Sequence, residues 1–203
     1  MFNIFNKNKR DFATMMKKPS SEAIVFVDFE FTGLDPLNCQ ILEAACVITD
    51  KELEEIVSSG SLVINQPEKV LSNMSEWCMK QHKESGLIEK CRESTLTLAR
   101  TEEYLCRLID VFVELRPDRL ATLAGNSVYM DKKFIDHHMP LLSKRIGHRL
   151  IDVSSISELC NRWYPSIWLN QPSKSRSHRA IDDVKDSIAQ LKFYREQIFI
   201  KSI

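Results

Sequence analysis

The feature that most constrains the fold is an apolar run with two acidic residues inside it. Residues 23–33 read AIVFVDFEFTG, and such β-branched and aromatic side chains favour a buried β-strand that ends at Thr-Gly. The twofold period of a strand directs Asp28 and Glu30 to the same face. Buried carboxylates cost free energy unless they are paired, protonated or bound to a metal. The two residues alone leave three explanations open, which are a salt bridge to a Lys or Arg, a solvated face of the strand, and a metal ion.

The rest of the pattern is that of a layered domain. Further strands are predicted over 41–50 and 61–65, forming an antiparallel meander with the first, and over 120–125. Asn126 and Ser127 follow the last of these and are expected to cap the next helix. Apolar periodicity predicts helices over 75–82, 96–115 (stopped by Pro117), 127–140, 155–163 and 180–197, with a loop over 165–177. Strands first and helices mixed in later predict an α/β or α+β domain with a mixed sheet.

Composition excludes several classes of protein. A chain of 203 residues, 43% of them hydrophobic, predicts one globular domain with a sizeable core. The 28 Lys and Arg residues balance 28 Asp and Glu residues, which disfavours long duplex nucleic acid but not a partner with one or two phosphates. No apolar run approaches the roughly 20 residues of a membrane span. Six cysteines without a C-x-x-C pair predict reduced thiols rather than a zinc site or a disulfide framework.

The first 20 residues differ from the remainder of the chain. They carry five basic residues and one acidic residue and have no continuous apolar segment of the secretory type. We expect residues 1–20 to form a flexible basic tail and residues 21–203 to form the domain. The alternative is a basic amphipathic segment of the mitochondrial-import type, because aromatic and aliphatic side chains are interleaved with the bases.

Two further segments carry groups that could join the acidic pair. The sequence SHRAIDD over 177–183 places His178 before a helix whose first turn holds Asp182 and Asp183, and either acid could be used. Asp131 lies one turn into a helix that follows a strand, which is where α/β folds place ligands. Each is ordinary by itself, since acids are favoured at helix N-termini. Together they predict two hard divalent cations held by oxygen ligands, with the histidine as a general base.

In this order, DFEFTGLDP, LAGNSVYMD and SHRAIDDVKDSIAQLKFYRE resemble the three motifs of the DEDDh exonuclease superfamily, and the resemblance is greater to its oligoribonuclease branch. It runs from about residue 23 to 198 and includes SEWCMKQHKESGL and IDVSSISELCNRWYP. It implies a ribonuclease H-like fold, with a mixed five-stranded sheet flanked by helices. It also implies an enzyme that hydrolyses very short RNA, chiefly 5′-phosphorylated dinucleotides, from the 3′ end to nucleoside 5′-monophosphates.

The resemblance also implies a role for individual residues. Two Mg²⁺ or Mn²⁺ ions would be held by Asp28, Glu30 and Asp183, with Asp131 as a further ligand, and His178 would be the general base. Asp182 is left without a role. A family of homodimers is implied, acting in the cytoplasm, in mitochondria or in both.

The same resemblance implies a binding site for the substrate. Leu34 would wedge between two bases in a pocket lined by Trp77 and His82, although both of these could instead be core residues. The 5′-phosphate would be capped by Ser127, Arg149, Ser154 and Ser155, partly from the neighbouring subunit. One departure is that His148 stands where the family has tyrosine, so we expect a less sharply formed cap.

Two other functions remain open on the sequence alone. One is a general single-strand 3′→5′ exonuclease with relaxed length preference, which should have an open groove with more basic and aromatic residues. The other is a catalytically inactive module that binds small nucleotides. Turnover with a divalent metal would separate the inactive module from both enzymes.

Overall fold

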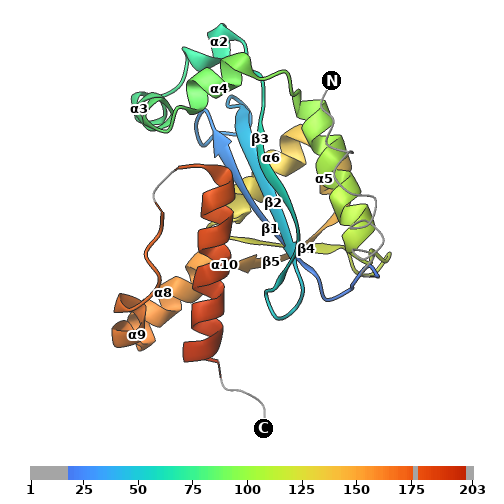
Figure 1. The fold of residues 1–203 in the computed structure, drawn as a ribbon, viewed down its shortest axis with the longest axis vertical. Helices are drawn as coiled ribbons and strands as arrows, with labels where there is room; N and C mark the ends of the chain where they lie inside the picture. Colours follow the sequence, from blue (N-terminus) through green and yellow to red (C-terminus); the bar gives the residue numbers. More distant parts are fainter. Residues whose placement is uncertain (1–17, 176–177, 200–203) are drawn as a thin grey trace, which may run out of the picture.

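The computed structural model describes residues 18–175 and 178–199. Five strands form one mixed sheet in the order β3-β2-β1-β4-β5 (Figure 1). At its centre β1 (Ile24–Phe31) pairs antiparallel with β2 (Ile41–Thr49) and parallel with β4 (Ala121–Gly125). The edges are β3 (Glu55–Val63), antiparallel to β2, and β5 (Ile146–Asp152), parallel to β4. The expected mixed five-stranded sheet is confirmed.

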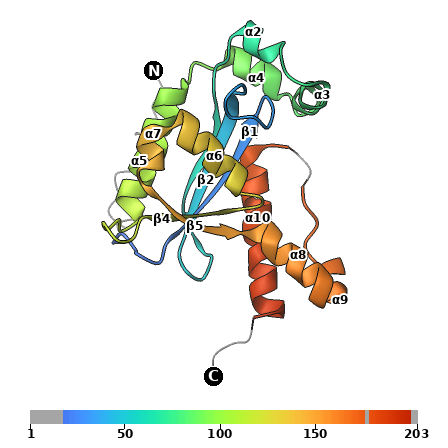
Figure 2. The same ribbon diagram turned by 180° about the vertical axis from the view of Figure 1, so that it is seen from behind.

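Helices cover both faces of the sheet because the residues of β1 alternate between two cores. Val25, Val27 and Phe29 pack with α5 (Leu98–Phe112), α6 (Tyr129–His138) and α7 (Pro140–Ser143), seen in Figure 2. Phe26 faces the other way, toward α8 (Val153–Trp163) and α10 (Ala180–Gln197). Asp28 and Glu30 have the parity of Phe26 and therefore belong to the α10 face.

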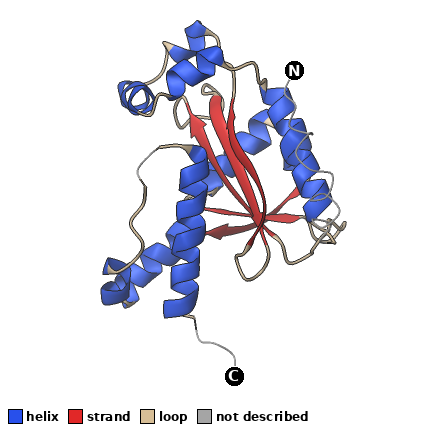
Figure 3. Cartoon of the chain, in the orientation of Figure 1, coloured by secondary structure: helices blue, strands red, loops and turns tan. Residues whose placement is uncertain are grey.

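Three short helices lie at one end of the sheet, beyond the β1–β2 connection (Figure 3). They are α2 (Glu68–Leu71), α3 (Glu76–Glu84) and α4 (Leu87–Glu93). A small core of their own joins them to Leu42 of β2. No helix of the described residues is long and apolar enough to cross a membrane.

Several predicted boundaries are wrong for identifiable reasons. Strand β3 begins at Glu55 rather than at 61, because an edge strand tolerates the polar residues 58–61 that break the apolar pattern. Helix α5 ends at Phe112, well before Pro117. The predicted loop over 165–177 contains α9 (Pro165–Leu169), which starts with a proline in its first turn.

The prediction that Asn126 and Ser127 cap α6 is also wrong. The residue before α6 is Val128, and no side chain caps this end. Ser127 instead has a positive φ of 53° and donates its backbone N–H to Asp152 at 3.0 Å. The side chain of Asn126 accepts the hydroxyl of Ser154, so both residues connect the end of β4 to the start of α8.

Candidate active site

Three carboxylates converge where β1 meets the first turn of α10. Asp28, Glu30 and Asp183 each offer an oxygen, and these oxygens all lie within 4.8 Å of one another. The prediction that the two β1 acids share a face is confirmed. Asp182 and Asp183 both lie in the first turn of α10, but only Asp183 belongs to this group. This decides which of the two acids is the candidate ligand.

A fourth carboxylate supports β1 from the side. Asp131, in the first turn of α6, is buried, and its Oδ1 accepts the backbone N–H of Phe29 at 2.9 Å. Phe29 lies between Asp28 and Glu30, so this bond places Asp131 beside the cluster, although not within the group of three. A role as a further ligand therefore remains a prediction.

Burial and mutual repulsion raise the pKa values of these acids, so that they resist ionisation in the absence of a cation. Burial, followed by repulsion from Asp183 and other acids, raises the pKa of Glu30 to about 8. Burial also raises the pKa of Asp131 to about 8 and that of Asp28 well above its ordinary value, with Asp131 adding to the effect on Asp28. The pKa of Asp183 is raised by burial and by Asp186. Oxygen-rich sites of this kind fit Mg²⁺ or Mn²⁺, whose charge relieves the repulsion.

His178 precedes α10, the helix that carries Asp183. It is exposed, has a positive φ of 49°, and stands two residues before α10. Its charge, when present, lowers the pKa of Asp183, which places the imidazole on the same side as the cluster. An exposed imidazole beside bound cations can accept a proton from water.

Two of the side chains expected to contact the bases are exposed. Leu34, after the end of β1, is 70% exposed, and Trp77 on α3 is 65% exposed. The alternative of a core tryptophan at position 77 is therefore wrong. His82 is buried, with its Nε2 on the carbonyl oxygen of Phe31 at 2.8 Å and its Nδ1 3.9 Å from Glu30. It thus connects α3 to the acidic cluster.

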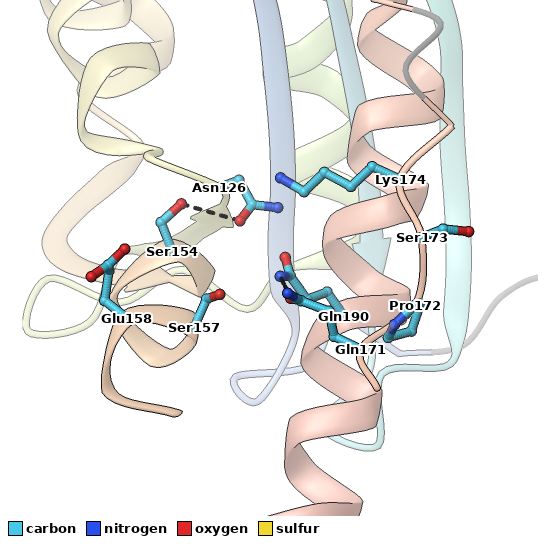
Figure 4. A pocket seen from close by; sticks show the side chains of 9 residues that line it. All are labelled: Asn126, Ser154, Ser157, Glu158, Gln171, Pro172, Ser173, Lys174 and Gln190. Atoms are coloured by element: carbon cyan, nitrogen blue, oxygen red, sulfur yellow. Dashed lines mark hydrogen bonds between the residues drawn. The ribbon is translucent and has the colours of Figure 1, made fainter. Parts of the chain in front are cut away.

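A polar cavity of about 530 Å³ opens between α8, the 171–174 segment and α10 (Figure 4). Ser154 on its wall donates its hydroxyl to the Asn126 side chain at 3.1 Å. A second cavity of about 530 Å³ shares Ser154 and is lined by Ser127 and Ser155 as well. The Ser127 and Ser154 hydroxyl oxygens are 3.2 Å apart. The structure therefore brings together the three serines that the resemblance assigns to a phosphate cap.

Sequence reasoning did not select Ser157, which also lines the first cavity. The signal was present, because Ser157 is three residues after Ser154 and so shares its face of α8. Lys174 lines the same cavity, and its charge lowers the pKa of Asp183. Lys174 therefore brings a positive charge to the cavity that acts on the cluster as well.

The remaining two predicted cap residues stand apart. His148 and Arg149 are exposed on the edge strand β5 and are not among the residues that line either cavity. Neither of these two cavities therefore joins the serines to this arginine within one chain.

Comparison with known proteins decides the family. A model of the exonuclease family matches residues 25–191. The mitochondrial oligoribonuclease of Mus musculus is 47% identical over 183 residues, which are 89% of this chain and 75% of that protein. The oligoribonuclease of Haemophilus ducreyi is 41% identical over 186 residues, 92% of this chain and 99% of that protein. The chain belongs to the oligoribonuclease family of exonucleases. The prediction made from the three motifs, including that of a phosphodiester-hydrolysing enzyme, is confirmed.

Solved structures agree with the fold of this oligoribonuclease-family chain. Exonuclease I of Methylocaldum szegediense superposes with a TM-score of 0.65 at 17% identity, covering 87% of this chain and 41% of that one. Exonuclease I of E. coli in a complex with single-stranded DNA gives a TM-score of 0.66 at 15% identity over 88% and 41% of the two chains. The chain thus spans about two fifths of these proteins. The expected ribonuclease H-like fold is confirmed.

Proposed function

We propose that this enzyme removes nucleoside 5′-monophosphates from the 3′ end of very short RNA, with 5′-phosphorylated dinucleotides as preferred substrates. The observation that carries the proposal is the group formed by Asp28, Glu30 and Asp183, in a chain that also has two cavities whose polar linings include serine hydroxyls. A scissile phosphate at the acids and a terminal phosphate at the serines would account for both features. The distance between them would then limit the length of the substrate.

Two Mg²⁺ or Mn²⁺ ions would be held by Asp28, Glu30 and Asp183, with Asp131 as a further ligand. When bound, such ions activate a water and stabilise the leaving 3′-oxygen during in-line displacement at phosphorus. His178 accepts the proton of the attacking water, for which its exposed position is suited. Asp131 also holds this part of β1 in place by accepting the backbone N–H of Phe29.

The substrate would be held at both ends. Leu34 and Trp77 present exposed apolar surface on which bases can stack, whereas His82 is buried. At the other end, hydroxyl groups of Ser127, Ser154 and Ser155 can donate to a 5′-phosphate. The guanidinium of Arg149 matches phosphate oxygens in a bidentate manner.

Because Arg149 and His148 line neither cavity of their own chain, we propose that a second copy of the chain supplies them. The enzyme would then act as a homodimer, and a monomer would lack part of the cap. The alternative that keeps the chemistry without the cap is a single-strand 3′→5′ exonuclease that accepts longer substrates.

The test is a single-turnover time course of 5′-labelled pGpG against a seven-nucleotide RNA, in Mg²⁺ and in Mn²⁺. We expect much faster loss of the dinucleotide, and no loss with Asp28→Ala. Equal rates would contradict the cap and favour the general exonuclease. No cleavage of either substrate would contradict the enzyme and favour a nucleotide-binding module.

The site of action is proposed to be mitochondria, the cytoplasm or both. Relatives from Mus musculus and Homo sapiens are named mitochondrial oligoribonucleases, and bacterial relatives are also found. The basic tail of residues 1–20 lies almost wholly outside the described residues. Fusing residues 1–20 to a fluorescent protein tests import. Fluorescence in mitochondria would support a presequence, and diffuse fluorescence would contradict it.

A further inference from the structure

A buried ion pair behind the acidic cluster has no part in the chemistry described so far. Glu43 on β2 is 0% exposed and lies opposite Glu30 in the sheet register. Its Oε1 accepts from Arg179 Nη2 at 2.6 Å, and its Oε2 accepts from Arg179 Nε at 3.0 Å. This is the bidentate arginine–carboxylate geometry, which fixes orientation as well as distance.

Two more donors complete the shell of this carboxylate. The backbone N–H of Ala180 donates to Oε2 at 3.3 Å, and the Ser61 hydroxyl donates to Oε1. Ser61 also accepts from Arg179 Nη2 at 3.0 Å. A carboxylate has about four acceptor positions, and all of them are used here. The three side chains, which we call the Glu43 clasp (Glu43, Ser61 and Arg179), form a network in which the buried carboxylate of Glu43 is fully hydrogen-bonded, with Arg179 half-buried and Ser61 exposed at its edge.

The clasp holds the start of α10, which lies between His178 and Asp183 in the chain. Arg179 is the N-cap residue of α10, and its side chain makes no cap bond to its own helix. Glu43 fills that place from β2 by binding the N–H of Ala180. The residue before Arg179 is His178, and Asp183 follows three residues after Ala180. One carboxylate therefore ties to the sheet both the base and a metal ligand.

The backbone of His178 has an unusual conformation that needs support from its surroundings. A φ of 49° is uncommon for a residue other than glycine and is retained only where the surroundings enforce it. The described neighbour that anchors this turn is Arg179, through the bonds to Glu43.

We propose that Glu43 is a positioning residue that, through Arg179 and Ser61, sets His178 and the first turn of α10 over the acidic cluster. This inference rests on the proposed function, because it needs His178 to be the base. None of the three clasp side chains belongs to the group of carboxylates or lines either of the serine-containing cavities. Its loss should lower kcat and leave KM for pGpG nearly unchanged, since the residues that hold the substrate are elsewhere.

The test compares kcat, KM and Tm in the full chain with Mn²⁺. Glu43→Gln is expected to lower kcat by about 10- to 100-fold, the range found when partners that orient active-site ligands are removed. Ser61→Ala keeps the arginine pair and is expected to lower kcat less, which provides a second variant should Glu43→Gln not fold. The double variant Glu43→Gln/Arg179→Met removes the unpaired buried charge and should recover Tm while kcat stays low.

Matched controls separate positioning from stability. Asp110→Asn disrupts a bidentate pair of the same geometry but greater exposure, with Arg145 at 2.7 and 2.8 Å, and should leave kcat within about twofold. Recovery of kcat together with Tm in the double variant would overturn the positioning role, as would unchanged kcat in a folded Glu43→Gln. Full activity of His178→Ala would instead overturn the proposed role of the base, and absence of cleavage by the wild-type enzyme would overturn the proposed function itself.

Discussion

At the scale of single residues, the acidic cluster opposes folding in the absence of cations. Glu30 and Asp131 have pKa values of about 8, and those of Asp28 and Asp183 are also raised, burial being the main cause. In the unfolded chain these acids titrate near pH 4. Between the two values the folded chain binds more protons than the unfolded chain, so its stability must fall as the pH rises.

We therefore predict that the metal-free protein loses stability between about pH 4.5 and 8, and that Mg²⁺ or Mn²⁺ restores it most at the upper end of this range. Thermal unfolding in a chelator and with each metal, at several pH values, measures this. Glu30→Gln should raise the stability of the metal-free protein at pH 8 by at least about 1 kcal/mol, because it removes a repelled carboxylate. A metal-free Tm that rises across this range would contradict the electrostatic account.

The sequence predicted these residues unequally. Asp28 and Glu30 could be found from strand parity alone, since charges in the most apolar strand need an explanation. Asp182 and Asp183 could not be separated, because that choice depends on how α10 is rotated about its axis. Glu43 gave no signal of its own, because its partner Arg179 is distant in sequence and the pair forms only when α10 packs on β2.

At the scale of elements, β1 and β4 approach each other more closely next to the site than any side chain would permit. A Cβ added to Gly125 would lie 2.7 Å from the carbonyl oxygen of Val27, the residue before Asp28. Gly125 is the last residue of β4 and leads to Asn126 and Ser127. The glycine therefore allows the end of β4 to lie directly against β1, one residue before Asp28.

Gly125→Ala is predicted to lower stability by about 1–3 kcal/mol, the usual cost of overpacking, and to reduce kcat by displacing β1. Gly147→Ala is the matched control, because its added Cβ would meet no atom closer than 3.6 Å. Denaturant unfolding and turnover of both variants check the prediction. Equal stability of the two variants would show that the strands can separate without cost.

Element types were more predictable than their ends. The helix over 180–197 follows from apolar periodicity alone and was found as α10 with the same bounds. The strand predicted over 61–65 missed the start of β3, because the polar residues of a sheet edge break the apolar pattern, and α9 is too brief for periodicity to detect. The residues after β4 resembled a helix cap but serve a contact with α8 that only the tertiary fold creates.

At the scale of the whole molecule, the proposed cap is divided between two copies of the chain. A mixing experiment tests this division. Asp28→Ala and Arg149→Ala are each expected to be inactive toward pGpG as pure proteins. In mixed dimers, the Arg149→Ala chain keeps its carboxylates and receives an intact arginine from the Asp28→Ala chain.

Equal mixing after subunit exchange should restore about a quarter of the wild-type rate, because half of the dimers are mixed and each has one complete site. Size-exclusion chromatography with light scattering verifies that dimers are present. No recovery in verified mixed dimers would mean that Arg149 acts within its own chain or does not form part of the cap.

The central claim is that Asp28, Glu30 and Asp183 together hold the divalent cations that hydrolysis of the phosphodiester requires. Its most direct test compares Asp183→Asn with Asp182→Asn, which remove the same charge from adjacent residues of one helical turn. We predict that Asp183→Asn lowers Mn²⁺ affinity in calorimetry and lowers kcat by about 100-fold or more, whereas Asp182→Asn changes each by less than about threefold. Equal effects of the two substitutions, or full activity of Asp183→Asn, would contradict the claim.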